Sequence, residues 1–158
     1  MKAISRVLPL VLVSLVFCVA IGAAQGGGKA VLWQAGEVKW TPSPAMKGLS
    51  VAPLWGDPAT GPYGALKKVA AGTDFGWHTH TSDQKVVAIS GTFDIQLEGG
   101  TPKQLSAGSY LMVPGGVKHM AKCRMGSDCM YFEEQPGKSD YIPATPPAAE
   151  AKKPAKKM

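Results

Sequence analysis

The chain has 158 residues, 45% of them hydrophobic, with 17 basic against 11 acidic side chains. Two of the basic residues lie close to the N-terminus, and four lysines lie in the last seven positions, so residues 25–151 keep 11 basic side chains against all 11 acidic ones. This near-neutral body argues against nucleic acid as a partner, because phosphate binding depends on clustered basic side chains.

The first 24 residues have the pattern of a secretory signal peptide. A basic start precedes an apolar run over residues 7–21, and the small residues 22–24 follow, which is the order of regions in a cleaved signal. The competing interpretation is a membrane anchor, but the run is shorter than the ~20 residues of a spanning helix, and Pro9 interrupts it. We therefore expect cleavage after Ala24, a periplasmic or secreted protein, and no stable membrane insertion of the mature chain.

Removal of the predicted signal leaves 134 residues, enough for one compact domain but too few for two ordinary ones. Residues 25–59 hold short apolar pieces broken by glycine and proline, which favours an N-terminal arm with edge strands over a long helix. The core of the domain is expected in residues 60–142. Residues 143–158 are rich in Pro, Ala and Lys without apolar periodicity, and they are predicted to form a disordered tail.

The expected core is a series of short strands. The segments are rich in strand-forming residues or alternate apolar and polar residues, and turns are predicted at Gly91 and at Gly99-Gly100. No stretch shows sustained helical amphipathicity. Many short strands with glycine turns favour a sandwich or a barrel. The predicted strands are residues 63–70, 84–90, 92–97, 110–113 and 130–133.

The three histidines of the chain lie in two glycine-punctuated segments, residues 72–80 and 108–119. Side chains two apart on a strand share a face, so His78 and His80 are placed to hold one ion together, with His119 as a third ligand. A structural role would be the better interpretation of one histidine alone. Three in this arrangement indicate a site for one divalent transition metal, and imidazole suits Fe, Cu, Ni and Zn alike.

These two segments resemble the cupin superfamily, whose motifs are G-x5-H-x-H-x3-E-x6-G and G-x5-P-x-G-x2-H-x3-N. Eight of the ten motif positions match, whereas Gln84 stands in place of the usual Glu and Cys123 in place of a frequent Asn. The resemblance covers roughly residues 60–135. It implies an all-β fold, a single-domain jelly-roll β-barrel with the metal held inside. The matching residues are Gly72, His78, His80, Gly91, Gly108, Pro114, Gly116 and His119.

The departure at Gln84 affects the charge of the expected centre. If three imidazoles and the Gln84 amide bind a divalent ion, the ion keeps its full formal charge, which would favour anionic ligands such as enolates and carboxylates. The alternative is that Gln84 only hydrogen-bonds a ligand or water. The arrangement resembles the three-histidine cupins, some of which are oxygenases.

Three further residues are candidates for a substrate pocket. Lys67 and Lys68 are adjacent on a predicted strand, so one of them should face inward, and we consider Lys68 together with Tyr110 and Met112. The simpler interpretations are an exposed lysine and ordinary filling of the barrel.

Cys123 and Cys129 flank a predicted hairpin of five residues outside the signal. In an oxidising compartment, a pair at this spacing favours a structural disulfide. The alternative is that Cys123, four residues after His119, reaches the metal or acts as a redox thiol.

The main functional hypothesis is an exported metal-binding cupin, a mononuclear oxygenase-type metalloenzyme that acts on a small anionic or chelating organic substrate. The second hypothesis is a non-catalytic cupin that binds or senses a metal or small ligand, and the third is a barrel with an empty site. No general base stands out in the sequence. A small molecule is the expected partner, and the resemblance also allows a homodimer joined through sheet edges.

Overall fold

The computed structural model describes residues 29–147, so the predicted signal peptide and most of the predicted tail lie outside the described residues. The chain divides into two units, Met1–Leu32 and Trp33–Met158. In the first unit only residues 29–32 are described, and they carry neither helix nor strand. The described part of the second unit carries the strands discussed below.

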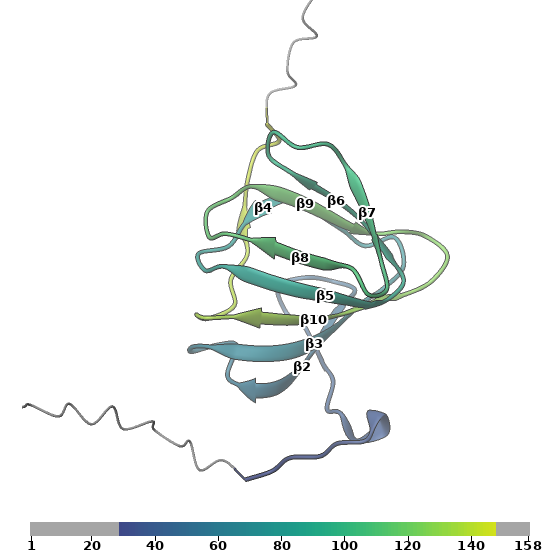
Figure 1. Cartoon of the computed structure of the whole chain (residues 1–158), viewed down its shortest axis with the longest axis vertical. Coiled ribbons are helices and arrows are strands. Elements are labelled where there is room, and N and C mark those ends of the chain that lie inside the picture. Colours follow the sequence, from purple (N-terminus) through teal and green to yellow (C-terminus); the bar gives the residue numbers. More distant parts are fainter. Residues whose placement is uncertain (1–28, 148–158) are drawn as a thin grey trace, which may run out of the picture. The chain divides into compact units, whose positions relative to one another are not determined.

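The described part of the second unit is built from strands, with one short 3-10 turn, η1, at Ala35–Glu37 (Figure 1). Within residues 29–147, no helix has the length and apolarity that crossing a bilayer would require. The prediction of an all-β fold is confirmed. The strands are β1 (Thr41–Pro42), β2 (Leu49–Gly56), β3 (Tyr63–Val69), β4 (Asp74–Thr79), β5 (Gln84–Ser90), β6 (Thr92–Leu97), β7 (Lys103–Ser106), β8 (Tyr110–Val113), β9 (His119–Cys123), β10 (Cys129–Gln135) and β11 (Ile142–Pro143).

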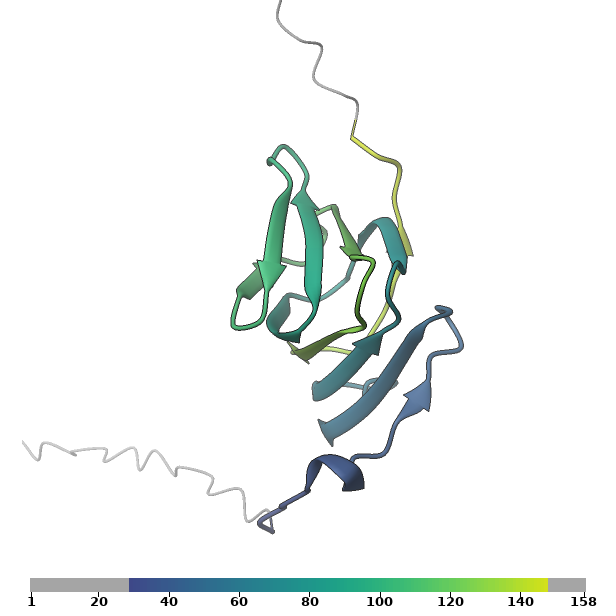
Figure 2. The same ribbon diagram turned by 90° about the vertical axis from the view of Figure 1, so that its right-hand side faces the viewer.

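The strands form two antiparallel sheets. The six-stranded sheet has the order β1-β2-β3-β10-β5-β8, and the five-stranded sheet has the order β11-β4-β9-β6-β7. Figure 1 shows β8, β5, β10, β3 and β2 in succession from top to bottom, and Figure 2 shows β2 and β3 side by side in blue and teal. From β3 to β11 the chain passes repeatedly from one sheet to the other, which is the connectivity of a jelly roll.

The core lies between the two sheets because both contribute inward-facing apolar side chains. On β10 every second residue is buried, which is the period of a strand with one face on the core. Phe93 and Tyr131, one from each sheet, meet edge to face with ring centroids 5.5 Å apart. The buried cluster consists of Val69, Phe75, Phe93, Ile95, Cys123, Cys129 and Tyr131.

Gly91 is the point at which the chain crosses from β5 to β6 and so from one sheet to the other. Its φ of +74° lies in the left-handed region that favours glycine. A Cβ atom at this position would also lie 2.7 Å from the Sγ atom of Cys129. The close crossing therefore requires a residue without a side chain.

The predicted disulfide between Cys123 and Cys129 is confirmed, with both side chains buried. The expected hairpin is not formed, because Cys123 ends β9 in one sheet and Cys129 begins β10 in the other. The bond therefore links the two sheets at one end of the core. It also leaves Cys123 without a free thiol for metal or redox chemistry.

Removal of the disulfide should destabilise the fold. A double Cys123→Ala/Cys129→Ala variant is expected to lose about 2 kcal/mol of unfolding free energy, because a short closed loop still restricts the unfolded chain. Denaturant unfolding with and without reductant measures this loss. The reductant should weaken only the parent protein, and equal stability of parent and variant would contradict the prediction.

Candidate metal centre

The three histidines lie together on the five-stranded sheet. His78 is near the end of β4, His80 follows directly after it, and His119 opens β9 in register with His78. All three side chains are buried, and the ring centroids of His78 and His119 are 4.2 Å apart. One ring nitrogen from each residue lies within 4.8 Å of the others. The two sequence segments therefore meet at one site, as their spacing predicted.

Each histidine uses its Nδ1 atom to contact a backbone carbonyl. Because a carbonyl can only accept, Nδ1 carries the proton in the neutral ring, and the lone pair remains on Nε2. Such orientation of the outer nitrogen is a common feature of metal-binding histidines. The acceptors are Gly76 for His78 at 3.0 Å, Val117 for His119 at 3.0 Å, and Asp140 for His80 at 2.6 Å.

The free nitrogens fit a metal ion. Nε2 of His80 is buried and has no hydrogen-bond partner among the described residues. A buried polar atom without a partner is costly unless something binds it. Three imidazole nitrogens that lie this close together form a donor set suited to a divalent transition metal.

The protonation of the site also suits a cation. Burial lowers the pKa of His78 to about 4 from its ordinary value of 6.5, the hydrogen bond with Gly76 opposes this, and the neighbouring His119 and His80 lower it further. Burial likewise lowers the pKa of His119. Both imidazoles are therefore neutral near pH 7, the state in which they can bind a metal.

The segment after β10 completes the site, although no pattern in the sequence indicated it. The Asp140 carbonyl orients His80, and the Asp140 carboxylate accepts hydrogen bonds from both the backbone N–H and the hydroxyl of Thr81. The Tyr141 ring stacks on His78 at 4.7 Å between centroids, and its hydroxyl donates to the Phe75 carbonyl. These residues lie about 60 positions from the histidines that they contact and share no short motif with them.

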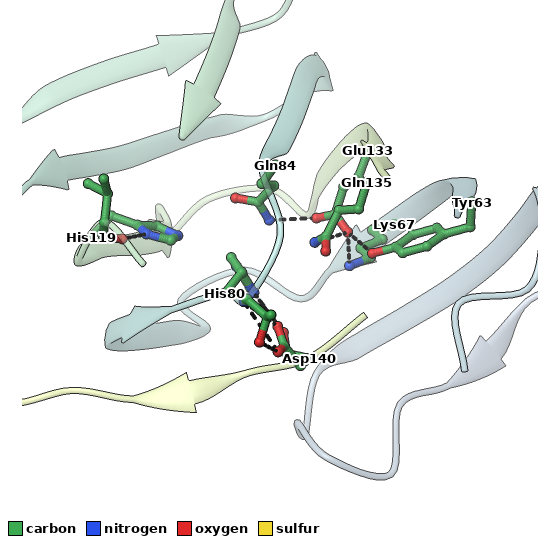
Figure 3. A network of polar contacts seen from close by, with 10 residues as sticks. Tyr63, Lys67, His80, Gln84, His119, Glu133, Gln135 and Asp140 are labelled. Atoms are coloured by element: carbon green, nitrogen blue, oxygen red, sulfur yellow. Dashed lines mark hydrogen bonds and ion pairs between the residues drawn. The ribbon is translucent and has the colours of Figure 1, made fainter. Parts of the chain in front are cut away.

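Gln84 is buried beside the histidines and belongs to a polar network centred on Glu133 of β10 (Figure 3). The amide Nε2 of Gln84 donates to Oε2 of Glu133 at 2.7 Å. The other carboxylate oxygen, Oε1, accepts from Lys67 Nζ at 2.5 Å, from Gln135 Nε2 at 3.2 Å and from the Tyr63 hydroxyl. All four donors are therefore committed to one carboxylate.

Glu133 is a buried carboxylate that stays ionised. Burial alone would raise its pKa, but the Lys67 ammonium and the hydrogen bonds from Lys67 and Tyr63 more than offset this and hold the pKa below its ordinary value. Burial and the same carboxylate raise the pKa of Tyr63, so its hydroxyl remains a donor. Together, Lys67 and Glu133 form a neutral pair inside the barrel.

The sequence reasoning missed Glu133, although a signal was present. Cys129, Tyr131, Glu133 and Gln135 alternate along one strand and share the buried face. If the cysteine and the tyrosine of this row are taken as core residues, the strand period places the glutamate in the core as well. A buried carboxylate needs partners, and these come from strands distant in the sequence.

The prediction that Lys68, Tyr110 and Met112 line a substrate pocket is wrong, because none of them lines the cavity. On β3 the inward lysine is Lys67, whereas Lys68 faces outward with its ammonium 4.2 Å from the centre of the Trp40 ring. Tyr110 and Met112 are 61% and 46% exposed. The physical reason is strand parity, since on β8 the alternate residues face inward.

A cavity of about 180 Å³ extends from the histidines into the barrel. Its polar part contains the three histidines, Gln84, Lys67, Glu133 and Asp140. The remaining wall is mainly aliphatic and aromatic. Its apolar lining consists of Ala45, Met46, Leu49, Phe75, Val86, Ala88, Phe93, Ile95, Leu105, Leu111, Ala121 and Tyr131.

Comparisons with known proteins agree with this architecture. The family model of the ChrR cupin-like domain matches residues 28–136. Among solved structures, the polyketide cyclase RemF from Streptomyces resistomycificus has a TM-score of 0.62 at 16% identity, covering 74% of this chain and 87% of its own. A predicted oxalate decarboxylase from Thermotoga maritima gives 0.57 at 16%, covering 68% and 99%.

The lyase DddQ from Ruegeria pomeroyi DSS-3, described as acting on DMSP, gives a TM-score of 0.56 at 16% identity, covering 68% of this chain and 61% of its own. No curated protein matches the chain. At these identities the structural similarity establishes the fold alone, and the neighbours differ in the reactions that they are named for.

Acid should destabilise the metal-free protein through His78. Between pH 6.5 and about 4 the unfolded chain binds a proton at His78 that the folded chain does not. The free energy of unfolding therefore falls as the pH is lowered through this window, by up to about 3 kcal/mol. Denaturant unfolding at pH 7 and pH 4.5 measures the fall, and a His78→Asn variant should show a smaller one. The same pH dependence in both proteins would contradict the attribution of the acid destabilisation to His78.

Proposed function

Since this chain belongs to the ChrR cupin-like domain family, we propose that it is an exported, metal-dependent cupin that acts on a small chelating organic anion. His78, His80 and His119 hold one divalent transition metal through their Nε2 atoms. The observation that carries this proposal is the clustering of three buried imidazoles, one of which has an Nε2 atom without a hydrogen-bond partner among the described residues. The buried disulfide is typical of exported proteins and supports the predicted signal peptide.

Gln84 is the fourth protein ligand in this proposal. Its amide nitrogen is committed to Glu133, so the amide oxygen is turned to the opposite side, and Figure 3 shows that oxygen on the side of His119. The carboxylate of Glu133 thus acts as a positioning group that selects which end of the amide faces the ion. Because all four ligands are neutral, the ion keeps its full double positive charge and attracts an anionic substrate.

The reaction class that fits best is an oxygenase. A transition metal at this site supplies Lewis acidity and, with iron, copper or nickel, access to oxygen chemistry. The residues of the chain bind the metal, orient the substrate and exclude water. None of them is needed as a base, and the Glu133 carboxylate has little capacity to take a substrate proton because it already accepts four hydrogen bonds. This disfavours the lyase, isomerase and hydrolase reactions that need a protein base.

The same saturation of Glu133 favours one competing function, a non-catalytic cupin that binds or senses a metal-chelating ligand. Both functions use the same ion and the same cavity. They differ in turnover, so oxygen consumption by the metal-loaded protein with chelating anions separates them. The structural neighbours that are named as enzymes support a catalytic function, but they are named for different reactions and so do not indicate which one.

The first test is metal content. Protein exported from a bacterial host and purified without an affinity tag or chelator should carry about one equivalent of Fe, Cu, Ni or Zn. A His78→Ala/His119→Ala variant should lose it, while a variant of the exposed Lys68, Lys68→Ala, should keep it. A parent protein that holds no metal, even after reconstitution, would contradict the proposal.

The second test exchanges the amide and the carboxylate. In Glu133→Gln the Gln84 amide loses its orienting anion, so the affinity for cobalt(II) should fall by roughly 10–100-fold, as expected for loss of an outer partner of a ligand. In Gln84→Glu/Glu133→Gln, the new amide donates to one oxygen of Glu at position 84 and leaves the other for the ion, so affinity should recover. The cobalt visible spectrum reports the ligand set, and thermal melting confirms folding. Unchanged affinity and spectrum in Glu133→Gln would exclude the positioning role.

A further inference from the structure

The cavity changes from polar to apolar in the same direction along several strands. On β5 the inward residues run from Gln84 through Val86 to Ala88. On β9 His119 is followed by Ala121, and on β10 the residue beyond Glu133 on the inward face is Tyr131. The register between β10 and β5 places the two polar ends side by side and the two apolar ends side by side, since Glu133 pairs with Val86 and Tyr131 with Ala88. The cavity thus has one polar end and one apolar end.

The charges of Lys67, Glu133 and the proposed metal indicate that the head group of a ligand lies at the polar end of the cavity. Lys67 is held by Glu133, so this lysine is already neutralised. In the proposed function the metal supplies the remaining positive charge, which places an anionic, chelating head at the histidines. This step of the inference rests on the proposed function.

The lining assigns the body of the ligand to the apolar end. Ser139 and Tyr141 also line the cavity, and Tyr141 stacks on His78. Away from the histidines and Glu133, the described lining residues offer hydroxyls at Ser43 and Tyr131, the thioether of Met46 and otherwise hydrocarbon. A body with several hydroxyls would lose hydration there without enough partners, at a cost for each one. An apolar body gains by burial against Val86, Ala88 and Ile95.

The size of the cavity limits the body to a single ring. The whole cavity, its polar end included, has a volume of about 180 Å³, little more than the ~150 Å³ of an apolar engineered cavity that binds benzene, so one ring is the upper limit for the body. Ala88, which is buried, and Ala121, which is half-buried, line the cavity with side chains of a single methyl group and so leave room inside it. The exposed lining residues Ala45, Ser139 and Tyr141 mark the side from which a ligand enters.

We propose that the substrate or ligand is a chelating organic acid or enolate whose body is one apolar group of about the size of an aromatic ring. The head occupies the metal end and the ring lies against Ala88 at the apolar end. Short dicarboxylates and polyhydroxylated acids are poorer ligands, because the first leave the apolar end empty and the second bury hydroxyls there.

Three probes with the same 2-hydroxycarboxylate head test this assignment. Mandelate carries a phenyl ring, glycolate has no body, and gluconate has a polyhydroxylated body. Calorimetric titration of the zinc-loaded protein is suitable because zinc does not change oxidation state. Zinc content is measured first, so that failure to bind metal is recognised separately.

Mandelate should bind roughly 10–100-fold more tightly than glycolate, the range expected when an apolar group fills a matching pocket, and gluconate should bind no more tightly than glycolate. In Ala88→Leu the side chain fills the place of the ring, so the ratio of mandelate to glycolate affinity should fall towards one; zinc content and thermal melting are measured to confirm that the variant keeps its metal and its fold. Ala107→Leu, on an exposed turn, is the matched control and should behave as the parent.

Several outcomes would overturn the inference. Equal affinity for mandelate and glycolate in the zinc-loaded parent, or preference for gluconate, contradicts it without reference to any variant and leaves the metal site intact. A retained mandelate preference in folded Ala88→Leu contradicts the placement of the ring. A parent that holds no zinc contradicts both the metal centre and the head group assigned here.

Discussion

The site depends on three hydrogen bonds between histidine Nδ1 atoms and backbone carbonyls. Each bond fixes the tautomer of a buried ring and directs its Nε2 lone pair to a common point. Two of the carbonyls, those of Gly76 and Val117, lie two residues before the histidine that they orient, so the chain directly before each histidine supplies them. The third comes from Asp140, which connects the ligand set to the segment after β10. The centre is therefore as rigid as the backbone around it.

The network around Glu133 adds a second constraint from the opposite sheet. An ionised carboxylate inside a barrel is stable only when several donors face it, and removal of one partner of such a pair is costly. Lys67 and Glu133 cancel in charge, so the network orients Gln84 without opposing a cation at the histidines. In the proposed function the metal alone then supplies the charge that attracts an anionic head, while the far wall of the cavity is apolar. Binding selectivity follows from this separation of charge and hydrocarbon along the barrel.

Local patterns predicted the features that depend on local geometry. The strand period placed His78 and His80 on one face, the motif spacing brought His119 to them, and short strands with glycine turns indicated an all-β fold. Contacts between distant segments left no such pattern, so the partners of Glu133 and the role of Asp140 emerged only from the structure. The prediction that Lys68 faces inward was wrong because adjacent residues on a strand face opposite sides, so an error of one position reverses the face. Pairing with the neighbouring strands decides which of the two lysines faces inward.

The most direct test of the account is the tautomer of the three histidines in the metal-free protein. Long-range ¹⁵N–¹H NMR at pH 7 distinguishes Nδ1–H from Nε2–H rings. The account predicts three neutral Nδ1–H tautomers, whose Nε2 resonances shift together when zinc(II) is added. Nε2–H tautomers, or zinc-induced shifts at the Nδ1 atoms instead, would contradict a centre that the backbone carbonyls orient in advance.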